Sequence, residues 1–87
     1  MNSHQTGIIL SFEMSMTVRI SSKEIAAKHV RAKRLQKGLS QEELAELCGL
    51  HRTYIGTVER AESSITLDSL DKIASALNIE TWELLKP

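Results

Sequence analysis

Residues 40–60 read SQEELAELCGLHRTYIGTVER, and this stretch decides the fold. Ser40 and Glu43 have the S-x-x-E spacing in which a hydroxyl and a carboxylate each cap the other residue's free backbone N–H. A helix is therefore expected to begin there. Gly49 adopts positive φ without strain, so it should end that helix and begin a turn. The stretch predicts two short helices joined by a tight turn.

The second of these helices is expected to have two unlike faces. Ile55 and Val58 are three residues apart, so they share one face, which would lie against the core. The other face carries side chains that form hydrogen bonds: Arg52, Thr53, Tyr54 and Thr57. An α-helix fits the major groove of DNA, where arginine donates two hydrogen bonds to guanine and threonine offers a hydroxyl and a methyl group. The pattern therefore predicts a surface that reads DNA.

Three motifs follow one another along the chain. R-x-x-K-G-L-S-Q-E-E-L-A begins at Arg34, G-L-x-x-x-Y-I-x-x-V-E-R begins at Gly49, and L-x-x-L-x-x-I-A-x-A-L begins at Leu67. From about residue 28 to residue 85 the chain thereby resembles the Cro and phage-repressor (xenobiotic-response-element type) helix-turn-helix family. Within that family, HRTYIGTVER looks most like the small controller proteins that regulate restriction–modification genes. The resemblance implies an all-α, five-helix DNA-binding domain like that of lambda repressor.

The resemblance also implies roles for individual positions. Side chains that would read base edges are those of Arg52, Thr53 and Thr57. Side chains that would contact the DNA backbone are those of Arg34, Gln41, His51 and Tyr54. Arg34 would in addition form a partly buried ion pair with Glu59. Phosphate contacts fix position and base contacts read sequence, so the first set is expected to determine specificity and the second affinity. The alternative for Arg52 is that it is an exposed cation paired with a neighbouring carboxylate. The alternative for Thr53 is that it lies beside the DNA contacts without making one.

Two positions depart from the family pattern. Ala61 stands where family members usually have Gly after the recognition helix, and positive φ costs a residue with a β-carbon roughly 1–2 kcal/mol. Either that helix ends differently or the strain is accepted. His51 would be the N-cap or the first residue of the same helix, where family members more often have Ser, Asp or Asn. Side-chain capping at His51 is therefore left open.

The segment before the motif combines a helix signal with concentrated positive charge. Ser21 begins a second S-x-x-E spacing, so a helix is expected over residues 22–37, with Gly38 ending it. The chain has no net charge, but residues 19–37 contain seven basic residues and one acidic residue, a net of +6. Residues 39–87 contain four basic and nine acidic residues, a net of −5. A local positive field suits a surface facing phosphates. The alternative is a solvated basic helix in a protein that never meets DNA.

The segment after the motif predicts two more helices. Thr66 is expected to cap the first, and Asn78 is expected to end it in the left-handed conformation. Its apolar residues recur at helical spacing and should form a buried stripe: Leu67, Leu70, Ile73, Ala74 and Leu77. A last short helix over residues 81–85 would bring Trp82 and Leu85 onto the core or onto a partner.

The N-terminal segment shows a different pattern. Residues 8–20 have an apolar residue at every even position, which is the period of a half-buried β-strand. A lone strand cannot satisfy its own backbone groups, and its open edge is a template for pairing. We therefore expect residues 1–20 to be a tail and strand added to a DNA-binding domain of residues 21–87, with the strand pairing between two copies. The alternatives are a strand along its own domain and a mobile leader before a start at Met14 or Met16.

Composition and spacing argue against several classes of protein. One cysteine rules out an intrachain disulfide framework and fits a reducing compartment. No apolar run approaches the ~20 residues of a membrane span, and the N-terminus lacks the basic-then-apolar order of a signal peptide, so a cytoplasmic protein is expected. His4, His29, His51 and Cys48 lack metal-ligand spacing, and no glycine-rich phosphate loop occurs. Neither an enzyme nor a metal, cofactor or small-molecule site is expected.

The expected partners are double-stranded DNA and a second copy of the chain. One recognition helix covers too few base pairs to find a site in a genome. A two-fold homodimer on an inverted repeat would place two such helices one DNA turn, ~34 Å, apart. The sequence thus predicts a DNA-binding transcriptional regulator, with a restriction–modification controller as the favoured subtype. The alternative is an antitoxin or coactivator-type protein-interaction module on the same fold. The operator, and activation versus repression, are left open.

Overall fold

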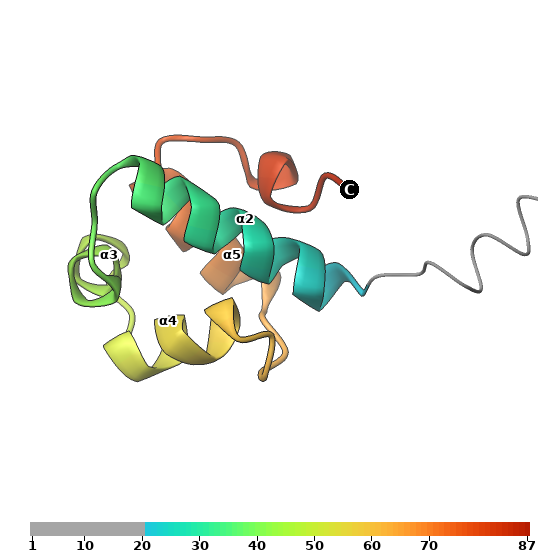
Figure 1. The fold of residues 1–87 in the computed structure, drawn as a ribbon, viewed down its shortest axis with the longest axis horizontal. Coiled ribbons are helices and arrows are strands. Elements are labelled where there is room, and N and C mark those ends of the chain that lie inside the picture. The colour runs from blue at the N-terminus through green and yellow to red at the C-terminus, as the bar shows by residue number, and fades with distance from the viewer. Residues whose placement is uncertain (1–20) are drawn as a thin grey trace, which may run out of the picture.

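The computed structural model describes residues 21–87, which contain four α-helices and one short 3-10 helix. In chain order the elements are α2 (Ser22–Gln36), α3 (Gln41–Cys48), α4 (Arg52–Glu59), α5 (Leu67–Ala76) and η1 (Thr81–Leu84). Figure 1 shows α2 across the centre of the molecule, with α4 on one side of it and η1 on the other. The all-α prediction is confirmed for this part of the chain. The strand expected over residues 8–20 lies outside the described residues.

Hydrogen bonds between residues three apart explain where α2 and α3 begin. The Ser21 hydroxyl accepts from the backbone N–H of Glu24 at 3.2 Å, and the Glu24 carboxylate accepts from the backbone N–H of Ser21 at 3.1 Å. Ser40 and Glu43 form the same pair of bonds, at 2.9 and 2.8 Å. Both helices therefore start at the residues that the S-x-x-E spacing predicts.

The four α-helices of the described part end in the same way. Each is followed by a residue in the left-handed conformation: Gly38 (φ 68), Gly49 (φ 69), Ala61 (φ 57) and Asn78 (φ 60). After α4 the N–H of Ala61 donates to the carbonyl of Val58 at 3.0 Å, and the N–H of Glu62 donates to the carbonyl of Thr57 at 2.9 Å. These two bonds form a Schellman motif, which satisfies carbonyls at the end of the helix. Of the two outcomes considered for Ala61, the strained one is present.

The core draws aliphatic side chains from every element. The largest fully buried side chains are those of Val30, Leu44, Ile55, Leu70, Ile73, Leu77 and Leu84. Helix α5 packs against α3, and η1 packs against both α5 and α2. The C-terminal segment is also fastened to α2, because the His29 ring donates from Nε2 to the carbonyl of Lys86 at 2.6 Å. Four helices thus enclose one small aliphatic core.

The prediction of five α-helices is wrong in its last element. Residues 81–85 were expected to form an α-helix, but residues 81–84 form a single 3-10 turn. The backbone N–H of Glu83 donates to the carbonyl of Glu80, and that of Leu85 donates to the carbonyl of Trp82, each at 3.0 Å. These bonds join residues three apart, as in a 3-10 helix, and such runs rarely exceed three or four residues.

The buried stripe predicted for α5 is wrong at its first residue. Leu70, Ile73, Ala74 and Leu77 are buried, but Leu67 is 72% exposed. Leu67 is the first residue of α5, and periodicity gives the direction of a side chain without saying how far a neighbouring element extends over it. Trp82 is 61% exposed, so it does not join the core either. Leu67 and Trp82 therefore lie on the surface, as do Leu35 and Leu47.

Candidate nucleic-acid interface

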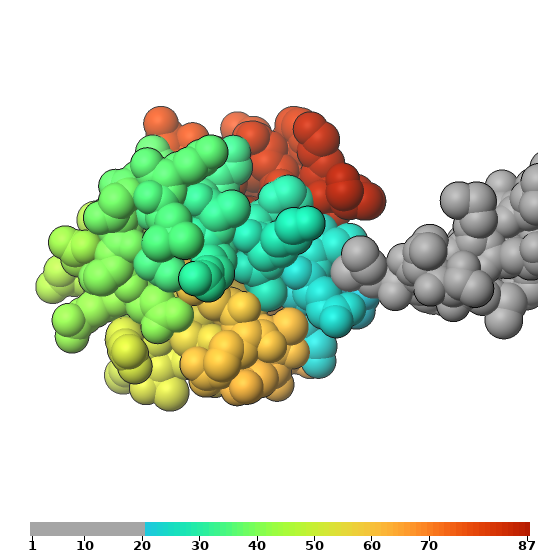
Figure 2. Space-filling view, viewed as in Figure 1, coloured from blue at the N-terminus to red at the C-terminus, as the bar shows by residue number. Residues whose placement is uncertain are grey.

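Helix α4 lies at the edge of the molecule and is held from behind by two other helices. It packs against α3 and α2, and Ile55 and Val58 bury its inner face. Figures 1 and 2 show α4, in yellow, along the edge opposite the red C-terminal segment. Side chains on the outer face of α4 are thus presented on a rigid support.

The N-terminal end of α4 presents unpaired hydrogen-bond donors. His51, Arg52 and Thr53 are exposed, and none of their side chains forms a hydrogen bond or ion pair within residues 21–87. His51 is the N-cap residue, but its side chain does not cap the helix. The first backbone N–H groups of α4 consequently lack a side-chain partner, and a helix N-terminus carries partial positive charge. This end of α4 can bind an anion or an acceptor atom on a base.

Tyr54 and Thr57 lie at the boundary between the outer face and the core. Both are half-buried, and the ring of Tyr54 packs against the core cluster. The face expected to carry hydrogen-bonding side chains is thus partly buried at these two positions. Tyr54 directly precedes the buried Ile55, and successive helical residues are only about 100° apart around the axis, so its ring reaches the core's edge. The hydroxyl of Thr57 donates to the backbone carbonyl of Tyr54 at 2.8 Å.

An ion-pair network of Arg34, Gln41 and Glu59 lies behind α4. Arg34 donates to the Glu59 carboxylate twice, from Nε at 2.6 Å and from Nη2 at 2.9 Å. Gln41 donates from Nε2 to the same carboxylate at 3.0 Å, and Arg34 Nη1 donates to the carbonyl of Leu39 at 2.7 Å. The side chains of Arg34 and Glu59 are only 10% and 4% exposed. The network joins α2, α3 and α4 and fixes their relative positions.

The network also determines the charge of the outer face of α4. The hydrogen bonds to Glu59 and its negative charge raise the pKa of Arg34, although burial acts in the opposite direction. Glu59 is the one acidic residue of α4, and Arg34 neutralises it from the inner side. Arg52 is therefore the only uncompensated charge that α4 itself carries, and it is positive. That sign suits a surface that faces phosphates and guanine bases.

Sequence reasoning missed two features of this surface. It assigned Gln41 a phosphate contact but not the bond to Glu59, and it assigned no role to Arg60. Both side chains lie over Gly56, where a Cβ atom would be 3.1 Å from Arg60 Nη1 and 3.6 Å from Gln41 Oε1. The signal available in the sequence was a glycine four residues before an arginine, because such residues share a helical face. Arg60 is half-exposed and pairs with Glu62 at 3.0 Å.

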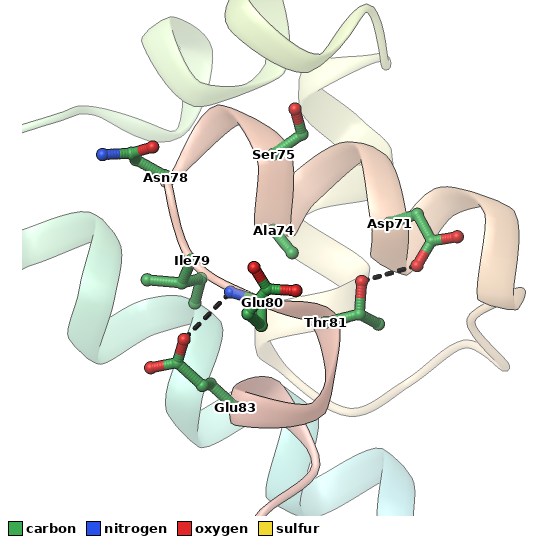
Figure 3. A pocket seen from close by; sticks show the side chains of 8 residues that line it. All are labelled: Asp71, Ala74, Ser75, Asn78, Ile79, Glu80, Thr81 and Glu83. Atoms are coloured by element: carbon green, nitrogen blue, oxygen red, sulfur yellow. Dashed lines mark hydrogen bonds between the residues drawn. The ribbon is translucent and has the colours of Figure 1, made fainter.

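A polar pocket of about 380 Å³ lies between α5 and η1, away from α4. Figure 3 shows Asp71, Glu80 and Glu83 on its rim; Thr81 donates to Asp71 at 2.5 Å, and the backbone N–H of Glu80 donates to Glu83 at 2.9 Å. Three carboxylates repel phosphates, so this side is unsuited to face a nucleic acid. Residues 21–87 contain no group of three or more His, Cys, Asp or Glu side chains placed to hold a metal, and no helix able to cross a membrane.

The fold and this site together define a helix-turn-helix protein. A capped helix α3, the left-handed Gly49 and an outward-facing α4 form the motif, and α2 and α5 support it. The helix-turn-helix family HTH_3 matches residues 30–84, and the chain belongs to this family.

Comparison with known proteins gives a narrower group. Control protein C.SmaI of Serratia marcescens is 56% identical over 63 residues, which are 72% of this chain and 75% of that protein. A hypothetical transcription factor of Neisseria meningitidis serogroup B is 46% identical over 63 residues, but the match spans only 59% of its length. The crystal structure of the restriction–modification controller protein C.AhdI of Aeromonas hydrophila has a TM-score of 0.69 and 45% identity, covering 71% of this chain and 94% of that one. The predicted resemblance to this family and to controller proteins is confirmed.

Proposed function

We propose that this protein is a sequence-specific DNA-binding transcriptional regulator that reads the major groove with the outer face of α4. The observation that carries the proposal is the rigid presentation of exposed Arg52 and Thr53 at the uncapped end of α4. Regulation of a restriction–modification system is the favoured role. The 56% identity to control protein C.SmaI and the structural likeness to controller C.AhdI support that role. In this role the protein acts by binding and not as an enzyme.

The DNA backbone is proposed to contact residues around α4. Arg34 uses three of its five N–H groups within residues 21–87, so one N–H on each terminal nitrogen is free for a phosphate. Gln41 has one remaining N–H on its amide and lies in the first turn of α3, where the helix dipole favours anions. Tyr54 can donate its hydroxyl, and His51 is exposed beside it. These four side chains would determine affinity, whereas Arg52, Thr53 and Thr57 would determine specificity.

A second copy of the chain is proposed to complete the reading surface. A groove of about 350 Å³ between the N-terminal ends of α2 and α5 has an apolar lining of Ile65, Leu67, Leu70 and Leu85. Leu67 is mostly exposed at this groove, and burying it against a second copy would remove that apolar surface from water. The alternating apolar residues of the segment 8–20 would add to the same dimer. Two copies of α4 would then read the two halves of an inverted repeat.

A binding experiment tests the proposal through Arg52→Ala. This variant should lose about 1–3 kcal/mol of discrimination at one base pair of each half-site, because its guanidinium would no longer bind guanine. Gln41→Ala should weaken binding to all sequences alike, and Lys72→Ala, which removes a cation from α5, should change little. Equal losses on operator and random DNA for Arg52→Ala would contradict the role given to that side chain.

The salt dependence of binding tests the function as a whole. In a gel shift over 50–200 mM salt, the affinity of a protein that contacts several phosphates should fall steeply, because bound counterions are released. Wild-type protein that binds no DNA at low salt would overturn the proposal. The protein-interaction alternative would then replace it.

A further inference from the structure

The two threonines on the outer face of α4 differ in their hydrogen bonding. Thr53 and Thr57 are four residues apart and so share a face of the helix. The hydroxyl of Thr57 donates its proton to the carbonyl of Tyr54 at 2.8 Å, whereas the hydroxyl of Thr53 has no partner within residues 21–87. Thr53 is free to donate or accept. Thr57 has already used its one proton inside the helix.

A threonine hydroxyl has one hydrogen and two acceptor lone pairs. Thr57 is half-buried, so its hydroxyl is held near the carbonyl of Tyr54 and does not turn freely into water. Thr57 therefore keeps an acceptor oxygen for an outside partner but has no proton left to donate. Arg52 presents the opposite chemistry, since a guanidinium has donors and no acceptor. The outer face of α4 thus has a donor at its N-terminal end and an acceptor further along.

Base edges in the major groove differ in the same respect. Adenine and cytosine offer an amino group that donates, thymine offers an acceptor and a methyl group, and guanine offers two acceptors. We infer that Thr57 accepts from the exocyclic amino group of an adenine or a cytosine; because every base pair carries one such group, Thr57 selects the strand on which it lies and disfavours guanine or thymine there. This inference rests on the proposed function, because it requires that α4 lies in the major groove.

The spacing of the two side chains predicts where this base lies. Five residues separate Arg52 from Thr57, which corresponds to about 7.5 Å along the helix axis. Base pairs follow one another at about 3.4 Å. The amino-bearing base is therefore expected about two base pairs from the guanine that responds to Arg52.

Selection of bound sites from random duplex DNA by the full-length chain is the first experiment. The expected result is a base pair about two positions from the Arg52-dependent guanine that is selected in one orientation, with adenine or cytosine always on the same strand. The second experiment replaces that base by an analogue that lacks the amino group, either purine for adenine or pyrimidinone for cytosine. Wild-type affinity should fall about tenfold.

Three variants assign this loss to the Thr57 oxygen. Thr57→Val keeps the β-branched shape but has no acceptor. Replacing the base by the analogue should therefore not lower the DNA affinity of this variant any further. Thr57→Ser keeps the acceptor and should show the wild-type loss. Thr53→Val is the matched control and should leave the loss at this position unchanged. Thermal unfolding followed by circular dichroism checks that each variant is folded.

Two results would overturn the inference while the proposed function stands. One is the absence of any strand preference for the amino-bearing base at this base pair. The other is an equal analogue effect in wild type and Thr57→Val. Wild-type protein that binds no DNA would overturn both. The two failures are thus distinguishable.

Discussion

The ion-pair network allows a quantitative test of how α4 is held. Arg34→Met removes the guanidinium but keeps an unbranched side chain. Glu59 would then retain Gln41 as its single donor, because Arg34 supplies two of its three hydrogen bonds. Removing one partner of a buried ion pair costs about 3–5 kcal/mol, and the Glu59 side chain is only 4% exposed. Roughly 4–13 kcal/mol of total stability is expected for 87 residues, so Arg34→Met should lose between about a quarter and all of it.

A double-mutant cycle measured by urea unfolding checks this magnitude. Glu59→Leu alone leaves Arg34 as an unpaired buried cation and should cost a similar amount. The double variant Arg34→Met/Glu59→Leu has no buried charge, so it should be more stable than either single variant. Arg34→Lys keeps the positive charge but cannot donate two parallel hydrogen bonds to the carboxylate. Its loss of stability should therefore lie between zero and that of Arg34→Met. The slope of free energy against urea concentration should stay constant across the set.

The pair formed by Arg60 and Glu62 supplies a matched control. Its two side chains are 55% and 56% exposed, so Arg60→Met should cost less than about 1 kcal/mol. Two outcomes would refute the reasoning about the buried network. One is an Arg34→Met loss no larger than that of Arg60→Met. The other is a double variant whose loss equals the sum of the two single losses.

Three further predictions concern other parts of the chain. Ala61→Gly should relieve the left-handed strain and stabilise the fold by about 1 kcal/mol, raising the Tm by about 4–8 °C; a lower Tm would contradict this. Burial raises the pKa of the Cys48 thiol, so the folded chain holds that proton more tightly than the unfolded chain. This contribution is complete below the ordinary thiol pKa and is lost above about pH 8.5, so urea unfolding should show a steeper alkaline loss in wild type than in Cys48→Ala. Leu67→Glu and deletion of residues 1–20 should each lower the mass in sedimentation equilibrium, and an unchanged dimer after the deletion would rule out an essential role for that segment.

The family resemblance predicted more of the site than the periodicity of apolar residues did. It indicated the pair formed by Arg34 and Glu59, which are 25 residues apart and do in fact bind each other. It did not indicate the bond from Gln41, although that bond completes the same network. Base and phosphate roles remain predictions, because they depend on a partner and not on the chain alone.

By itself, the sequence determined where α2, α3 and α5 begin and end. The S-x-x-E pairs and the left-handed residues act between neighbours three to five positions apart, and such contacts form wherever those residues occur in that order. The tertiary structure decided what the surface side chains do. It left Leu67 exposed, brought Gln41 to Glu59 from 18 residues away, placed Tyr54 at the core's edge and shortened the last helix to one turn. These outcomes depend on how far elements that are distant in the sequence extend over one another. Their packing in three dimensions determines this.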